Sequence, residues 1–204
     1  VYDGAEIHES VLVMLRLSQL GIAYQCLAPN INQMHVVNHL TGEEMPETRN
    51  VLVESARIAR GDVLDIAKAI ATDYDAVIFP GGFGVAKNLC NFAVKGPDMT
   101  LNADVAAFAQ AIQSAGKPVG LICIAPAMAP RLFGEGTQCT IGTDADTAAA
   151  IKAMGGDHKD CSVYQLVVDE TKNVISTPAY MLAGNIAEAA EGISRLVETV
   201  VERC

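Results

Sequence analysis

The stretch Lys117-Pro118-Val119-Gly120-Leu121-Ile122-Cys123-Ile124-Ala125-Pro126-Ala127-Met128 decides the fold. Its first part, Pro118 to Ile122, is a short apolar run after a Gly-Lys-Pro turn, which is typical of a strand buried on both faces. The small residues and the proline that follow Cys123 are typical of the first turn of a helix. We therefore expect Cys123 to lie at a corner between a buried strand and a helix.

A nucleophile at such a corner faces the backbone N–H groups of the next residues and the positive end of a helix dipole. In that field a thiol is biased toward thiolate, its reactive form. Cysteine is also among the most buried residue types, so a lone Cys after an apolar run is more often core than catalyst, by roughly three to one. Position alone leaves both interpretations of Cys123 open.

A second stretch, from Asp75 to Gly84, has a similar organisation. It reads Asp-Ala-Val-Ile-Phe-Pro-Gly-Gly-Phe-Gly, an apolar strand that runs into a Pro-Gly-Gly turn. Glycine lets the backbone approach a ligand and leaves N–H groups free to bind it. The spacing of a phosphate-binding loop is absent, so an oxyanion pocket and a plain tight turn are the alternatives. Gly81, Gly82 and Cys123 follow expected strands, where catalytic groups gather in α/β folds.

Strands and helices alternate along the chain, which predicts an α/β fold with a parallel sheet covered on both faces. With 204 residues, 50% of them hydrophobic, we expect one domain over 1–204. A helix that precedes its strand at the start is unusual in such a chain. We therefore expect that a leading strand before Val1 belongs to the fold and is missing from the sequence. The expected helices cover 6–20, 50–60, 66–72, 86–94, 102–115, 144–154 and 181–203, and a further helix runs from the Cys123 corner to residue 132. The expected strands cover 22–28, 75–79, 118–122, 138–142, 164–169 and 173–177, with a further hairpin over 33–43.

Composition restricts the function. The formal net charge of −10 argues against a nucleic acid or an anionic membrane surface as partner. No apolar run approaches the ~20 residues that a membrane-spanning helix needs. The six cysteines contain no C-x-x-C pair, which indicates reduced intracellular thiols and neither a disulfide framework nor a zinc site. His35 and His39 would share a face only on a helix, so we expect no metal ion there, and no cofactor.

Several motifs in a fixed order carry a resemblance that spans the whole chain. They are Tyr2-Asp-Gly-Ala-Glu-Ile-His-Glu9, His39-Leu-Thr-Gly-Glu43, Glu47-Thr-Arg-Asn50, Ala56-Arg-Ile-Ala-Arg-Gly61, Phe79-Pro-Gly-Gly-Phe-Gly84, Ala86-Lys-Asn-Leu89, Cys123-Ile-Ala-Pro126 and Thr177-Pro-Ala-Tyr180. With them the chain resembles the PfpI and glyoxalase-III-like group of the class I glutamine amidotransferase-like superfamily, and within it the isoprenoid-biosynthesis glyoxalases (sigma cross-reacting protein-like). The resemblance implies a flavodoxin-like three-layer sandwich with a mostly parallel sheet.

The resemblance also implies an activity. It implies a glutathione-independent, cofactor-free glyoxalase, a lyase that converts glyoxal or methylglyoxal to the 2-hydroxy acid. Cys123 would be the nucleophile and Glu9 the acid/base, although Glu9 alone reads as an ordinary helix-surface carboxylate. Backbone N–H groups at Gly81, Gly82 and Ile124 would form the oxyanion pocket. Relatives commonly form homodimers, and the expected compartment is the cytoplasm, or the mitochondrial matrix in a eukaryotic source.

The chain also departs from its relatives. PfpI-like peptidases carry His directly after the cysteine, where this chain has Ile124, and the deglycase branch has a His on the next strand, which here reads Cys139-Thr-Ile-Gly142. None of the four histidines matches either position, so a peptidase or amidotransferase triad does not carry over. Two alternatives to the glyoxalase stay open: repair of early glycation adducts by the same cysteine, and a redox-sensing or partner-binding role in which Cys123 is oxidised.

Overall fold

The computed structural model describes residues 1–204 and has a four-stranded sheet at its centre. Three strands of this sheet are parallel, and the fourth pairs antiparallel at one edge. The order is β3 (Val77–Phe79), β4 (Val119–Ile122), β8 (Val174–Thr177) and β7 (Val167–Asp169). Two parallel pairs lie beside it, β1 (Cys26–Ala28) with β2 (Val63–Asp65) and β5 (Gln138–Cys139) with β6 (Asp157–His158). The predicted α/β class with a mostly parallel sheet is confirmed.

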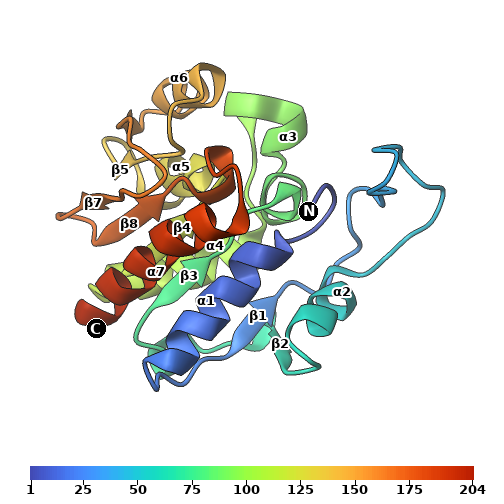
Figure 1. Cartoon of the computed structure of the whole chain (residues 1–204), viewed down its shortest axis with the longest axis horizontal. Helices are drawn as coiled ribbons and strands as arrows, with labels where there is room; N and C mark the ends of the chain where they lie inside the picture. The colour runs from blue at the N-terminus through green and yellow to red at the C-terminus, as the bar shows by residue number, and fades with distance from the viewer.

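Helices cover both faces of the central sheet (Figure 1). On one face lie α1 (Ile7–Gln19) and α7 (Ile186–Glu202), and on the other lies α4 (Ala103–Ser114). The side chains of β4 alternate between the two layers, because Leu121 belongs to the core beneath α4 and Ile122 to the core beneath α7. This is the three-layer sandwich that the resemblance implied.

The remaining helices are short and lie in the connections. They are α2 (Val51–Ile58), α3 (Phe92–Lys95), α5 (Ala129–Phe133) and α6 (Ala145–Ala153), with 3₁₀ turns at Ile66–Lys68, Ala71–Asp73, Gly96–Asp98, Ala125–Met128 and Ala179–Met181 and a π-helical turn at Val85–Leu89. No helix in the structure combines the length and the apolar character needed to cross a bilayer.

Three of the expected helices and the expected hairpin differ from what the structure shows. The helix expected over 86–94 is interrupted, since Cys90 adopts an extended conformation and pairs with Leu101. The helix expected from residue 181 begins at Ile186, because the Asn185 side chain accepts hydrogen bonds from the next backbone amides and caps it there. The helix expected over 66–72 is two 3₁₀ turns, and the hairpin over 33–43 is reduced to one antiparallel bridge, Val37 with Glu44.

Three expected strands are much shorter than predicted, and the one expected over 164–169 keeps only Val167–Asp169. The strand expected over 22–28 keeps only Cys26–Ala28, which pairs with β2 alone, and Ile22 and Tyr24 ahead of it are exposed. The strand expected over 138–142 keeps only Gln138–Cys139. The sequence analysis missed β2 and β6, which are three and two residues long.

The N-terminal cap of α4 can be tested by substitution. The Asn102 side chain accepts hydrogen bonds from the amides of Asp104 and Val105, at 3.0 and 3.1 Å. We expect Asn102→Ala to lower the free energy of unfolding by about 1 kcal/mol, because two amides at the helix start lose their partner. Asn102→Ser keeps an acceptor and is expected to retain most of that stability in urea unfolding. Equal losses in both variants would show that the cap contributes nothing.

Candidate active site

Cys123 lies at the corner between β4 and the short helical turn that begins at Ala125. Its φ of 63° is in the left-handed region, which non-glycine residues rarely adopt. The neighbouring β8 holds the corner, because the Cys123 amide donates to the Thr177 carbonyl at 3.0 Å. The side chain is nearly covered, with 7% of the residue exposed. The predicted corner is confirmed, and its backbone is strained as a nucleophile elbow is.

Gly81 brings the end of β3 against this corner. A Cβ atom added there would lie 2.4 Å from Cβ and 2.9 Å from Sγ of Cys123, and 2.8 Å from a carboxylate oxygen of Glu9. No side chain fits at those distances, so only glycine allows the three residues to meet. The structure therefore brings Gly81, Cys123 and Glu9 together, although they lie far apart in the sequence.

Glu9 is fully buried in the first turns of α1. One carboxylate oxygen accepts the Gly81 amide at 2.7 Å, and the other accepts the Tyr180 amide at 3.3 Å. Burial raises the pKa of Glu9 to about 7, although the two backbone amides and the Cys123 thiol favour the charged form. Glu9 is therefore no surface carboxylate. At neutral pH it lies near the midpoint between acid and base.

The pKa of the Cys123 thiol is raised well above its ordinary value. Burial is the main cause, and the negative charge of Glu9 adds to it. The expectation that the corner favours the thiolate in the resting protein is wrong, because desolvation and a carboxylate neighbour outweigh the backbone N–H groups. The pair therefore carries a proton at neutral pH, and the Glu9 carboxylate lies beside the sulfur.

Two backbone amides stabilise charge at the sulfur. The N–H groups of Gly82 and Ile124 favour the charged form of Cys123 and lower its pKa, against the larger opposing effects of burial and of Glu9. The third expected oxyanion donor, Gly81, is differently placed, since its N–H already donates to Glu9. Gly82 and Ile124 thus surround the sulfur, and Gly81 orients the carboxylate.

The sequence analysis missed two residues of this site. The Glu6 side chain accepts the Glu9 amide at 2.7 Å, which caps α1 and adds a second buried carboxylate that raises the pKa of Glu9. The spacing of three residues between Glu6 and Glu9 fits an N-cap and was the available signal. The backbone contact of Tyr180 has no sequence signal, because it depends on where the turn after β8 comes to lie.

None of the four histidines is among the groups that shift the pKa of Cys123. The Nδ1 atom of His8 lies 2.7 Å from the hydroxyl of Tyr180, and Nε2 of His158 accepts the Ile141 amide. His39 lies against the N-terminal amine. The chain contains no group of three or more His, Cys, Asp or Glu side chains arranged to hold a metal ion.

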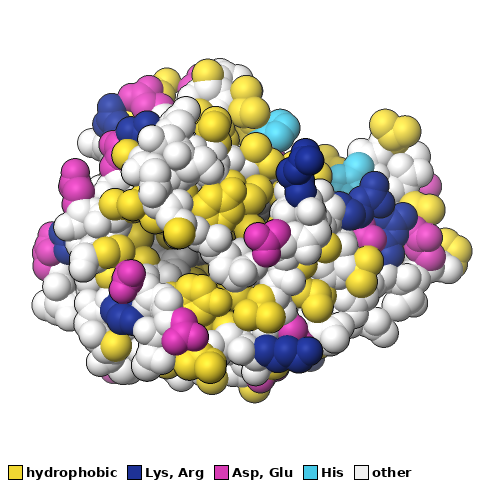
Figure 2. Space-filling model, turned by 90° about the horizontal axis from the view of Figure 1, so that it is seen from below, with side chains coloured by type: hydrophobic (Ala, Val, Ile, Leu, Met, Phe, Trp, Pro, Cys, Tyr) yellow, Lys and Arg dark blue, Asp and Glu magenta, His cyan; other side chains and the backbone are white.

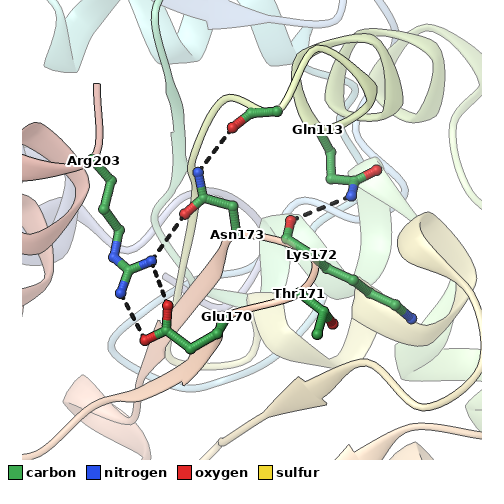
Figure 3. A pocket seen from close by; sticks show the side chains of 7 residues that line it. Gln113, Glu170, Thr171, Lys172, Asn173 and Arg203 are labelled. Atoms are coloured by element: carbon green, nitrogen blue, oxygen red, sulfur yellow. Dashed lines mark hydrogen bonds and ion pairs between the residues drawn. The ribbon is translucent and has the colours of Figure 1, made fainter.

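A polar surface pocket of about 390 Å³ lies at the opposite end of the sheet. Arg203 there donates to the carboxylate of Glu170, and Asn173 donates to the Gly116 carbonyl (Figure 3). Gly116 and Asn173 precede β4 and β8, whereas Cys123 follows β4. The pocket is therefore separate from the cysteine, and its arginine is already paired with Glu170.

The fold is a sheet between two layers of helices, and a buried Cys–Glu pair lies at one of its strand-to-helix corners. This combination defines a DJ-1/PfpI-type, class I glutamine amidotransferase-like protein. A solved isoprenoid biosynthesis protein with an amidotransferase-like domain from Ehrlichia chaffeensis superposes with a TM-score of 0.92 and 37% identity, over 99% of this chain and 93% of that one. Glyoxalase III from Candida albicans, at 14% identity and a TM-score of 0.62, covers 98% of this chain and 88% of its own and shares the fold alone.

Relatives in sequence extend this result. Human glutamine amidotransferase-like class 1 domain-containing protein 3, mitochondrial, is 43% identical over 212 aligned positions, which cover 99% of this chain and 79% of the human protein. The mitochondrial ES1 protein of Danio rerio is 37% identical over 197 positions, covering 88% of this chain and 73% of its own. No family model matches the chain. The chain belongs to this family of glutamine amidotransferase-like class 1 (ES1) proteins.

Proposed function

We propose that this protein is a glutathione-independent glyoxalase that converts glyoxal or methylglyoxal to the 2-hydroxy acid. The observation that carries the proposal is the buried pair of Glu9 and Cys123. A carboxyl group whose pKa is about 7 touches a thiol that two free backbone amides also face. Isomerisation of a 2-oxoaldehyde needs a nucleophile, one group that gives and takes protons, and donors for an oxyanion, and this pair with its amides supplies each of them.

The first step forms a bond between Sγ of Cys123 and the aldehyde carbon. As the sulfur attacks, its proton passes to the Glu9 carboxylate, and the carbonyl oxygen becomes an oxyanion held by the amides of Gly82 and Ile124. Glu9 then returns the proton to that oxygen, which gives a hemithioacetal. The raised pKa of the thiol suits this order, since the proton leaves sulfur only when the carbonyl is in place.

The second step moves one hydrogen between the two carbons. The Glu9 carboxylate removes the proton from the carbon bonded to sulfur, giving an enediolate, and the hydroxyl proton of that carbon passes to the oxygen of the neighbouring carbon. The protonated Glu9 then delivers its proton to the neighbouring carbon. The product is a thioester of the hydroxy acid on Cys123. Water hydrolyses this thioester, releasing the hydroxy acid and restoring the thiol, so one water is consumed and no oxidant or reductant is needed.

The two alternatives have less support from the geometry. Repair of glycation adducts on proteins requires a cysteine that a bulky partner can reach, whereas Cys123 is 7% exposed. A redox sensor requires a thiol that is readily ionised, whereas burial and Glu9 raise the pKa of Cys123. A small aldehyde is the substrate that a covered, proton-bearing thiol suits best.

The names of the sequence relatives bear on the compartment of the protein. The human and Danio rerio relatives are mitochondrial proteins by name, and we propose the mitochondrion as the compartment if the host is a eukaryote. A second copy of the chain remains the proposed partner. Sedimentation velocity of the purified protein at two concentrations tests it, and a single monomer species at both would overturn it.

The substrate is tested with free glyoxal and with a glycated N-acetyl-lysine model, in the absence of glutathione and metal ions. We expect hydroxy acid to form in many equivalents per protein from free aldehyde, and from the adduct only as fast as the adduct releases aldehyde. Cys204→Ser, which replaces the exposed cysteine, serves as the matched control and is expected to retain full activity. Faster turnover of the adduct than of free aldehyde would reverse the assignment in favour of repair.

A further inference from the structure

We propose that Glu6 restricts the reaction at Cys123 to uncharged carbonyl compounds, by repelling molecules that carry a carboxylate or phosphate group. The inference rests on the proposed function for the reaction itself and adds the class of substrate. Glu6 is held between Glu9 and the turn after β3. Its amide donates to the Gly81 carbonyl at 2.9 Å, and one of its carboxylate oxygens accepts the Glu9 amide at 2.7 Å. The carboxylate is therefore fixed beside the reacting pair, in a residue that is 9% exposed.

Capping of α1 does not by itself explain a glutamate at this position. Short side chains such as Asn, Asp, Ser and Thr are the preferred helix caps. The caps of α2, α4, α6 and α7 are of this kind and none of them is buried; they are Asn50, Asn102, Asp144 and Asn185. Glu6 is buried, and burying a carboxylate costs free energy that a neutral cap avoids. The charge of Glu6 therefore needs a reason beyond the cap.

Neither carboxylate of the site has a cationic partner. The ion pairs of the chain include neither Glu6 nor Glu9. No lysine or arginine is among the groups that shift the pKa of Glu9 or of Cys123. The amine of Val1 does respond to Glu6, but burial lowers the pKa of this amine despite the charges of Asp3 and Glu6, which weakens it as a counter-charge. An incoming molecule therefore meets negative charge that no side chain of the site neutralises.

Unpaired negative charge at this place discriminates between carbonyl compounds. The amides of Gly82 and Ile124 are the donors available for the oxyanion that forms on attack by sulfur. A second anionic group on the substrate would find no partner and would lie near Glu6 and Glu9. Such a like-charge contact is the repulsive element by which a site rejects a competing ligand. The same repulsion acts on the hydroxy acid anion after the thioester is hydrolysed, and it favours product release.

The charge of the whole molecule also repels anions, and its effect has to be separated from that of Glu6. The formal net charge is −10, and Figure 2 shows Asp and Glu side chains, in magenta, spread over one face. A field of this kind acts on exposed groups in general. The exposed thiol of Cys204 reports it. Repulsion by Glu6 predicts a further effect at Cys123.

The test compares two alkylating reagents of similar size, iodoacetamide, which is uncharged, and iodoacetate, which is an anion. Their rates of reaction with Cys123 and Cys204 of the full chain are read from peptide masses at pH 9, where the Val1 amine is mostly uncharged. Both reagents react with the thiolate, so the ratio of their rates at one thiol does not depend on how much of that thiol is ionised. Glu6→Gln keeps an oxygen that can cap α1, and Glu43→Gln, at an exposed position, is the matched control.

We expect the preference for iodoacetamide to be at least about tenfold larger at Cys123 than at Cys204, and Glu6→Gln to reduce it at Cys123 at least about threefold. Glu43→Gln is expected to leave the preference unchanged. Equal preferences at the two thiols, or equal effects of Glu6→Gln and Glu43→Gln, would overturn the inference. Absence of labelling at Cys123 by both reagents would also overturn it, since a site closed to small uncharged molecules has no need to select by charge.

Turnover of methylglyoxal and of a phosphorylated derivative of it separates this inference from the proposed function. We expect Glu6→Gln to narrow the preference of the wild type for the uncharged aldehyde. Hydroxy acid formation with an unchanged preference would overturn charge selection by Glu6 and leave the glyoxalase standing. Charge-selective alkylation of Cys123 with no hydroxy acid from either aldehyde would overturn the glyoxalase and leave charge selection standing.

Discussion

Gly82→Ala is expected to destabilise the protein by about 4 kcal/mol or more, or to prevent folding, which is at the extreme of single substitutions. Gly82 has a φ of 92°, and a Cβ there would lie 2.4 Å from the backbone nitrogen of Glu6. A backbone atom cannot move aside as a flexible side chain can. The turn after β3 would have to leave the start of α1, and the amide of Gly82 would leave Cys123. Urea unfolding followed by circular dichroism measures the loss.

Gly21→Ala is the matched control for this substitution. Gly21 also has a positive φ, 71°, but no atom lies within 4 Å of its added Cβ. Its cost is the conformational strain alone, about 1–2 kcal/mol. If Gly82→Ala and Gly21→Ala cost the same, the close approach of the β3 turn to α1 is not what requires glycine at position 82.

Glu9→Gln is expected to remove a pH dependence of stability worth about 3 kcal/mol between pH 5 and 8. Burial raises the folded-state pKa of Glu9 to about 7 from its ordinary value of 4.5. Between these values the folded protein holds a proton that the unfolded chain has released, so stability falls as pH rises through this window and levels off above it. Glutamine carries no proton to lose, so the variant lacks this fall.

The measurement is the free energy of unfolding of the wild type minus that of the variant, taken at intervals from pH 5 to 8. Glu43→Gln, at an exposed position, serves as control for the loss of one formal charge, and its difference from the wild type is expected to stay constant. A Glu9→Gln difference that is also constant would contradict the raised pKa and with it the acid/base role of this carboxyl group.

The sequence predicted the parts of the site that depend on local pattern. A buried apolar strand followed by small residues placed Cys123 at its corner, and the same pattern placed Gly81 and Gly82 beside it. Both stretches could be predicted because parallel strands are apolar along their whole length and their carboxyl ends meet at one edge of the sheet. The resemblance was needed for Glu9, since its helix position alone does not show that it points inward.

The remaining features depend on tertiary contacts that no local pattern records. The raised pKa of the Cys123 thiol follows from burial and from a carboxylate more than one hundred positions away. The strand β6 at Asp157–His158 is too short to show a period, and its pairing with β5 alone defines it. The early end of the helix expected over 86–94 likewise follows from the bridge between Cys90 and Leu101.

The most direct test of the central claim counts hydroxy acid formed from carbon-13-labelled glyoxal by NMR, for the wild type, Cys123→Ser and Glu9→Gln. Product must be counted, because lysine and arginine side chains consume aldehydes without turnover. The proposed chemistry predicts many equivalents of glycolate per wild-type protein, and a loss of at least about a thousandfold in both variants, since nucleophile and acid/base act as one unit. Equal, sub-stoichiometric consumption of glyoxal by all three proteins would contradict it.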